Sequence, residues 1–129
     1  WKQSGYAILG MAHEALGDLM AAAEAYRKGL QFEKRNEDAR IMTLNLGVLD
    51  MKAGNRKDAE KYLKEAVGLN GSDSDRRAKA YLYLAKNCEA MTDFRGANAY
   101  ATVVVTLFDN KEFAEEAKKI LQRCGENVK

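Results

Sequence analysis

Three segments of the chain carry the same residue types in the same order, and this repetition limits the possible folds more than any other feature. In each copy a small residue follows a leucine, a helix-breaking pair begins seven residues later, and an alanine follows that pair. The copies are Leu9-Gly10, Gly17-Asp18 and Ala22; Leu46-Gly47, Gly54-Asn55 and Ala59; and Leu84-Ala85, Thr92-Asp93 and Ala97. The same pattern thus returns every 37 or 38 residues, and a nearly fixed period of this length is typical of proteins built from stacked supersecondary units.

The stretches between the breaks predict helices. Proline is absent, and apolar residues recur at helical spacing among Ala, Leu, Lys and Glu. A glycine ends a helix and the next Asp or Asn caps the following one. We expect helices over 3–16, 19–32, 39–53 and 56–69 and on either side of Thr92-Asp93, and a seventh that ends at Gly125. In that last helix, Asp109 and Glu112 have capping-box spacing, and the apolar stripe is Phe113, Ala117, Ile120, Leu121 and Cys124.

One segment, 102–107, reads TVVVTL and has strand propensity because its residues are β-branched. It occupies the position of a second helix in the third copy. Packing within a repeat overrides propensities of a few tenths of a kcal/mol per residue, so we predict helix here.

The pattern resembles the tetratricopeptide repeat, which has W-x2-L-G-x2-Y in its first helix and A-x3-F in its second. The first copy is most similar, with Tyr6, Leu9-Gly10, His13, Ala22 and Tyr26 in these positions. The resemblance covers about 3–109. It implies an all-α, right-handed α-α superhelix of seven helices in a single domain, 1–129, with repeats at about 3–36, 40–73 and 78–109 and a capping helix at about 111–124.

The copies also depart from that family. Lys34, Gly71 and Asp109 replace its terminal proline, and His13, Asp50 and Cys88 stand in an aromatic position. The repeats are 37 and 38 residues long, measured from Gly10 to Gly47 and from Gly47 to Ala85, whereas 34 is usual. We therefore expect one extra turn at the start of the first helix in the second and third copies, with Asn36 and Ser72 as caps.

By this resemblance, function lies on a concave groove lined by the first helix of each hairpin. The groove residues that the resemblance implies are Ala7, Met11, Glu14, Ile41, Leu44, Asn45, Val48, Met51, Lys79, Leu82, Lys86 and Glu89. Most of them are apolar. An exposed apolar surface rich in methionine is suited to an amphipathic helix or an extended peptide. The alternative is that this stripe belongs to the core.

Some members of the family bind a C-terminal carboxylate of a chaperone through a clamp of lysines, asparagines and an arginine. Asn45 and Lys79 match that clamp. Ala7 and Met11 stand where a lysine and an asparagine are expected, and Tyr83 replaces the arginine. The sequence therefore favours a different peptide partner.

A second class of function is structural assembly. The chain starts at Trp1 without a methionine, and we interpret it as a fragment of a longer protein. Further repeats, or a second copy of the chain, would then bury the groove or the Trp1 edge. The outer face of the last helix is charged or polar, with Glu115, Glu116, Lys118, Lys119, Gln122 and Arg123, which is typical of a solvated cap.

Composition and motifs argue against other classes. The formal net charge is only +2, with both signs interspersed, which does not favour nucleic-acid binding, and no stretch approaches the roughly 20 apolar residues of a membrane span. His13 is the one histidine and lacks the second histidine of HExxH. Cys88 and Cys124 belong to no metal or redox motif, and we expect free, buried thiols. We expect no enzymatic activity, cofactor or metal, and the compartment stays open between cytoplasm and cell envelope.

Overall fold

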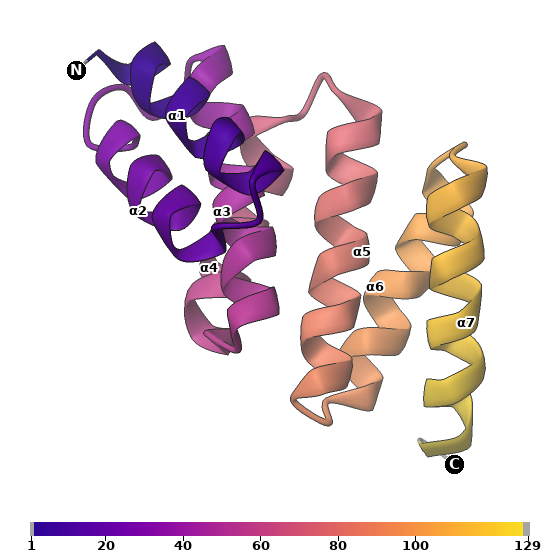
Figure 1. The fold of residues 1–129 in the computed structure, drawn as a ribbon. Helices are drawn as coiled ribbons and strands as arrows, with labels where there is room; N and C mark the ends of the chain where they lie inside the picture. The colour runs from indigo at the N-terminus through magenta and orange to yellow at the C-terminus, as the bar shows by residue number, and fades with distance from the viewer. Residues whose placement is uncertain (1, 128–129) are drawn as a thin grey trace. The chain divides into compact units, whose positions relative to one another are not determined.

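A computed structural model describes residues 2–127, and these residues form seven α-helices and no strand (Figure 1). The helices are α1 (Gln3–Ala15), α2 (Leu19–Gly29), α3 (Glu37–Ala53), α4 (Arg56–Leu69), α5 (Ser74–Ala90), α6 (Phe94–Leu107) and α7 (Lys111–Asn127). The all-α prediction with seven helices is confirmed for this part of the chain.

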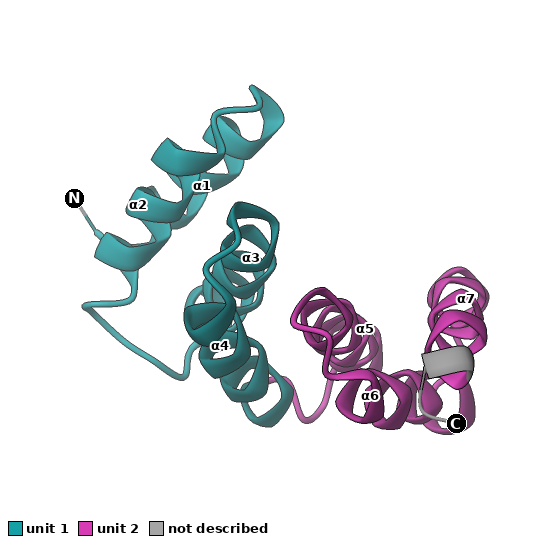
Figure 2. Ribbon diagram, turned by 90° about the horizontal axis from the view of Figure 1, so that it is seen from below, with its two compact units in different colours: residues 1–69 teal, residues 70–129 magenta. Residues whose placement is uncertain are grey.

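The chain divides into two compact units, one of residues 1–69 and the other of residues 70–129 (Figure 2). In the first unit α1 pairs with α2 and α3 with α4, and α3 also packs against both α2 and α1. In the second unit α5 pairs with α6, and α7 packs against both of them. Each unit is therefore a stack of antiparallel neighbours joined by short turns.

The three hairpin turns have the same backbone geometry. Each contains one residue with a left-handed φ: 81° at Gly17, 86° at Gly54 and 59° at Thr92. In each turn the next residue donates its backbone N–H to the carbonyl oxygen five residues earlier: Asp18 to His13 at 2.9 Å, Asn55 to Asp50 at 2.8 Å and Asp93 to Cys88 at 2.9 Å. The break pairs found in the sequence thus form equivalent turns, even where threonine replaces glycine.

Side-chain caps define where several helices begin. Asp18, Asn36 and Asp93 accept the backbone N–H three residues later, as predicted. Two expected caps are wrong: Asp73 caps α5 instead of Ser72, and Asn110 accepts the N–H of Phe113 at 3.0 Å in place of Asp109. The helix expected to end at Gly125 continues to Asn127.

The lengths of α3 and α5 fit the expected extra turn. Each has 17 residues, whereas α1 has 13. The 102–107 segment is helical within α6, as predicted. Its two threonines donate their hydroxyls to the carbonyl oxygens four residues earlier, Thr102 to Asn98 at 2.8 Å and Thr106 to Thr102 at 2.7 Å, and Val104 is buried.

Each unit has its own hydrophobic core. Tyr26, Met42, Leu46 and Leu49 fill the first, together with small alanines from α1 and α2. The second core is built from α5, α6 and α7, and its larger members are Leu82, Cys88, Val104, Ile120 and Cys124. The apolar stripe expected on α7 faces this core: Ala117, Ile120 and Cys124 are buried, and Phe113 and Leu121 pack against it.

Small residues set how closely paired helices approach. A Cβ atom added to Gly10 would lie 2.3 Å from a ring carbon of Tyr26, and one added to Gly47 would lie 2.8 Å from the side chain of Leu63. Ala22, Ala59 and Ala97 are fully buried at the matching positions of the second helices. The small residues that repeat in the sequence are therefore the contact points of the hairpins.

We expect Gly10→Ala to lower the free energy of unfolding by about 1–3 kcal/mol, because the new methyl overlaps the fully buried Tyr26 ring. Urea unfolding measures this change. Gly68→Ala is the matched control, since no atom lies within 4 Å of a Cβ at this helical position. The control should be stabilised by about 0.5–1 kcal/mol through helix propensity. Equal effects of both variants would contradict this account of the α1–α2 contact.

Candidate protein-interaction surface

Eight of the groove residues implied by the resemblance lie on α1 and α3, which pack together in the first unit. Their exposure differs. Ala7 is only 2% exposed and belongs to the core, and Leu44 and Val48 are also buried. Met11 is 40% exposed, and the half-buried members are Glu14, Ile41, Asn45 and Met51. Met11 therefore offers the most accessible apolar side chain of this set.

A buried tyrosine brings two of these residues together. The Tyr26 hydroxyl, from α2, donates to a carboxylate oxygen of Glu14 on α1 and accepts the Asn45 Nδ2–H of α3 at 3.3 Å. Burial, and then the hydrogen bond to Glu14, raises the pKa of Tyr26 above its ordinary value. The phenol therefore stays neutral and links three helices through one oxygen atom.

We expect Tyr26→Phe to destabilise the chain by about 1–3 kcal/mol, because Glu14 and Asn45 both lose a partly buried hydrogen-bond partner. Chemical denaturation near neutral pH measures the difference. Tyr62→Phe serves as the control, since Tyr62 is a half-buried aromatic residue of the same unit outside this network. A loss no larger in Tyr26→Phe than in Tyr62→Phe would show that the hydroxyl network adds nothing to stability.

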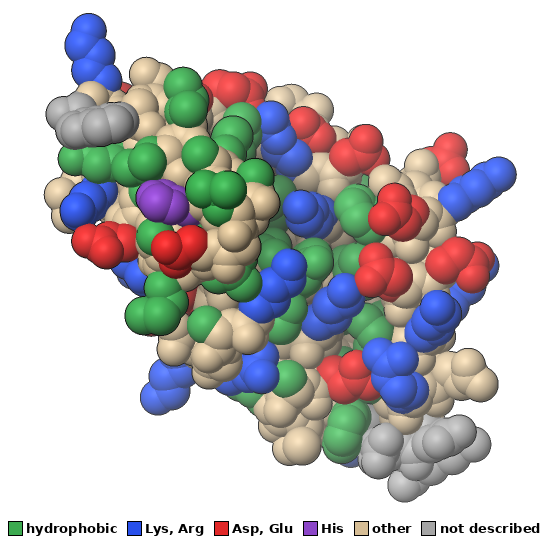
Figure 3. Space-filling model, viewed as in Figure 1, with side chains coloured by type: hydrophobic (Ala, Val, Ile, Leu, Met, Phe, Trp, Pro, Cys, Tyr) green, Lys and Arg blue, Asp and Glu red, His purple; other side chains and the backbone are tan. Residues whose placement is uncertain are grey.

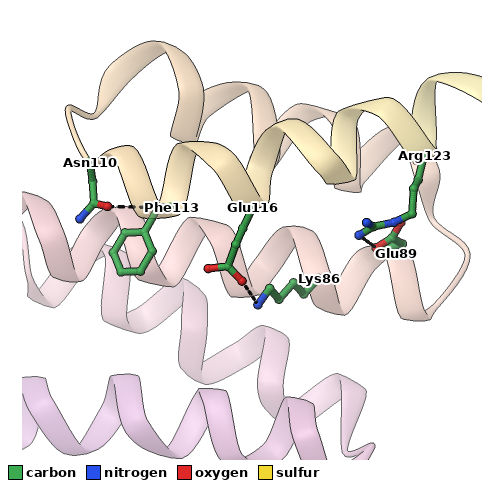
Figure 4. A network of polar contacts seen from close by, with 6 residues as sticks. All are labelled: Lys86, Glu89, Asn110, Phe113, Glu116 and Arg123. Atoms are coloured by element: carbon green, nitrogen blue, oxygen red, sulfur yellow. Dashed lines mark hydrogen bonds and ion pairs between the residues drawn. The ribbon is translucent and has the colours of Figure 1, made fainter.

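The other four residues of the set lie on α5, in the second unit. Leu82 is fully buried in the core, and Lys79 is half-buried. Lys86 and Glu89 point to α7, as Figure 4 shows. Lys86 Nζ lies 2.8 Å from Glu116 Oε1, and the Arg123 guanidinium donates two hydrogen bonds of 2.8 Å to the Glu89 carboxylate.

Through these ion pairs, two charged residues of the expected outer face of α7 bind residues of α5. Glu116 and Arg123 join α7 to α5, while Glu115, Lys118, Lys119 and Gln122 are exposed. The two hydrogen bonds from Arg123 lower the pKa of Glu89, so the charged form of Glu89 is favoured in the folded state. Close by, burial raises the pKa of the Cys124 thiol, and the charge of Glu89 adds to this effect.

The stabilisation from Glu89 should depend on pH. Its folded pKa lies below its unfolded value, so the contribution is present at neutral pH and is lost as the pH falls through the acidic range. Because Arg123 is more than half exposed, we expect Glu89→Gln to cost only about 0.5–1 kcal/mol at pH 7. The difference from wild type should shrink as the pH falls through the acidic range, because protonation of the carboxylate removes the ion pair.

Denaturant titrations between pH 3 and pH 7 test this expectation, and Glu115→Gln removes the same charge from an exposed pair with Lys118 as the control. The control should change stability by less than about 0.5 kcal/mol. A Glu89→Gln effect that is equally large at both ends of the pH range would assign it to packing instead of charge.

Sequence reasoning missed a second apolar surface, which is formed by the first hairpin. Strongly exposed apolar side chains lie on α1, on α2 and in the segments that follow them: Ile8, Leu16, Leu19, Met20 and Phe32. Figure 3 shows hydrophobic side chains gathered at the surface over α1. The sequence did contain a signal for this surface. Leu16 comes directly before the Gly17-Asp18 turn and Leu19 and Met20 directly after it, where polar residues are usual.

The described residues contain no group of three or more His, Cys, Asp or Glu that could hold a metal ion. Cys88 and Cys124 are buried and form no disulfide. Over residues 2–127, no helix combines the length and the apolar character needed to cross a membrane.

No protein-family model matches this chain, and no curated protein matches it either.

Proposed function

We propose that this chain is a tetratricopeptide-type scaffold that binds a peptide or helix of another protein and performs no catalysis. The observation that carries this proposal is the concentration of exposed apolar side chains on the first hairpin. Seven large apolar residues are exposed in the described part of the chain, and six of them lie between Ile8 and Phe32. Apolar patches of this kind usually mark surfaces that a partner covers.

The repeated geometry supports the same proposal. Three equivalent turns, two glycine contacts between paired helices and the 17-residue length of α3 and α5 are the features expected of stacked hairpins that present one side of their first helices to a ligand. Met11 is the point at which the proposed groove and the exposed apolar surface of α1 meet. A flexible methionine is suited to a surface that adapts to its ligand.

We expect Met11→Asp to reduce binding of the partner about tenfold or more, because it places a charge in an apolar contact. The measurement is quantitative affinity capture from an extract of the cells that make the protein, followed by mass spectrometry. Thr102→Asp is the control, since Thr102 is an exposed residue of α6 in the second unit. A protein retained by wild type and by Thr102→Asp, but lost with Met11→Asp, would support the proposal. Identical capture by all three would contradict it.

Structural assembly is a second candidate, and the very exposed Leu16 and Met20 favour it, at 81% and 86%. Here another copy of the chain, or further repeats, would cover the first hairpin. Light scattering over a concentration series separates the two candidates, because self-association raises the solution mass with concentration. A rise that Met20→Ser abolishes would favour assembly, and a constant monomer mass would leave the surface free for a different protein.

A further inference from the structure

Helix α1 differs from the other helices in the residues that it exposes. These residues are Ser4, Ile8, Met11, Ala12 and Ala15, and none of them is charged. Within residues 2–127, every other helix exposes at least one charged side chain. An outer face with charged residues is usual for a helix at a protein surface, whereas a helix that lacks such a face is normally buried. The composition of α1 therefore indicates a helix that another helix covers.

Four of the exposed residues form a seam along α1 that fits one partner helix. Ser4, Ile8, Met11 and Ala15 are separated by four, three and four positions, which is the spacing with which two helices pack side by side. Ile8 is 68% exposed and Met11 is 40% exposed. Small residues lie at both ends of the seam and large apolar residues lie in its middle. The spacing and the residue sizes are therefore the same in either direction along the helix.

From this symmetric and uncharged seam, we propose that α1 pairs antiparallel with α1 of a second copy of the chain. A two-fold axis through the middle of the seam sets Ile8 against Met11 of the other copy, and Ser4 against Ala15. Large residues then meet at the centre, and the small residues at both ends let the helices approach. The proposal rests on the proposed protein-binding function and names a second copy as the protein that supplies the bound helix.

The charges around the seam favour a second copy over a helix with a charged face. A charged side chain placed on the seam would lose water and gain no partner, because Glu14 at its border is already bound by the Tyr26 hydroxyl. Two exposed charges of opposite sign flank α1, Lys2 before its start and Asp18 after its end. Antiparallel pairing brings each Lys2 to the end at which the other copy has Asp18, so this attraction occurs twice.

The length of the seam sets the expected affinity. Helix α1 has 13 residues and is about 20 Å long. One pair of helices of this length is short for the roughly 800 Å² that each partner contributes to a stable interface, so we expect a weak dimer with a Kd on the order of 10–100 µM. The dimer should therefore be visible only as a function of protein concentration.

Sedimentation equilibrium from about 5 to about 500 µM tests the dimer, and we expect the mean mass to rise from that of one chain towards that of two. Ile8→Asp places a charge against Met11 of the other copy and should raise the Kd at least about tenfold. Leu107→Asp is the matched control, since Leu107 on α6 is 71% exposed, and it should leave the mass curve unchanged. A constant monomer mass, or an equal loss of dimer in both variants, would overturn the proposal. Circular dichroism shows whether each variant keeps its helix content.

Cross-linking tests the antiparallel orientation. The variants Ile8→Cys and Met11→Cys are oxidised separately and as an equimolar mixture, with a tag on one of them. We expect about threefold or more disulfide-linked dimer in the mixture, because Ile8 faces Met11 of the other copy and a disulfide forms only between close residues. Cys88 and Cys124 are buried, so wild type should not cross-link. Linkage of each variant mainly to itself, or no linkage in the mixture, would overturn the antiparallel pair.

Failure of the dimer is distinguishable from failure of the proposed function. If the chain stays monomeric while Met11→Asp still removes a captured protein, only the dimer is wrong. If the chain dimerises through Ile8 while Met11→Asp removes no other protein from the capture, the dimer holds and binding of a different protein at Met11 is wrong.

Discussion

The close approach of paired helices at small residues is the constraint on which the rest of the structure depends. Tyr26 lies against Gly10 and Leu63 against Gly47 at distances that leave no room for a methyl group, so the paired helices pack closely at these two points. The left-handed residue at each turn then reverses the chain within a few residues. Together these two features turn a helical sequence into hairpins, and the hairpins decide which side chains become core and which remain exposed.

Much of the fold could be predicted from the sequence, because helix boundaries follow local rules. The three turn pairs and the cap at Asn36 depend on residues within one or two turns of each other. The helical state of 102–107 was predicted instead from the place of this segment in the third copy, against its local strand propensity. The errors lie where two neighbouring residues could serve equally: Asp73 caps α5 beside Ser72, and Asn110 caps α7 beside Asp109. Spacing alone cannot choose between adjacent caps, since the choice depends on backbone angles at the helix start.

The candidate surface was harder to predict, because it depends on partners far away in the sequence. Ala7 and Met11 lie one turn apart on α1, yet one is buried in the core and the other is exposed. Lys86 and Glu89 read as free charges at a groove edge, but Glu116 and Arg123 of α7 bind them from about 30 residues away. A periodic pattern fixes the side of a helix to within one residue, and that uncertainty separates a core position from a binding position.

The aromatic position of the resembled repeat shows that a buried polar residue needs hydrogen-bond partners that an aromatic ring does not need. In the second copy this position holds Asp50, which is buried, paired with Arg27 and left with one unsatisfied oxygen. A ring here would pack without further needs, whereas a carboxylate requires donors from the surroundings. Arg27 and Asn55 supply them on one oxygen only. A buried polar residue that is incompletely paired at a packing position therefore costs stability that an aromatic ring would not cost.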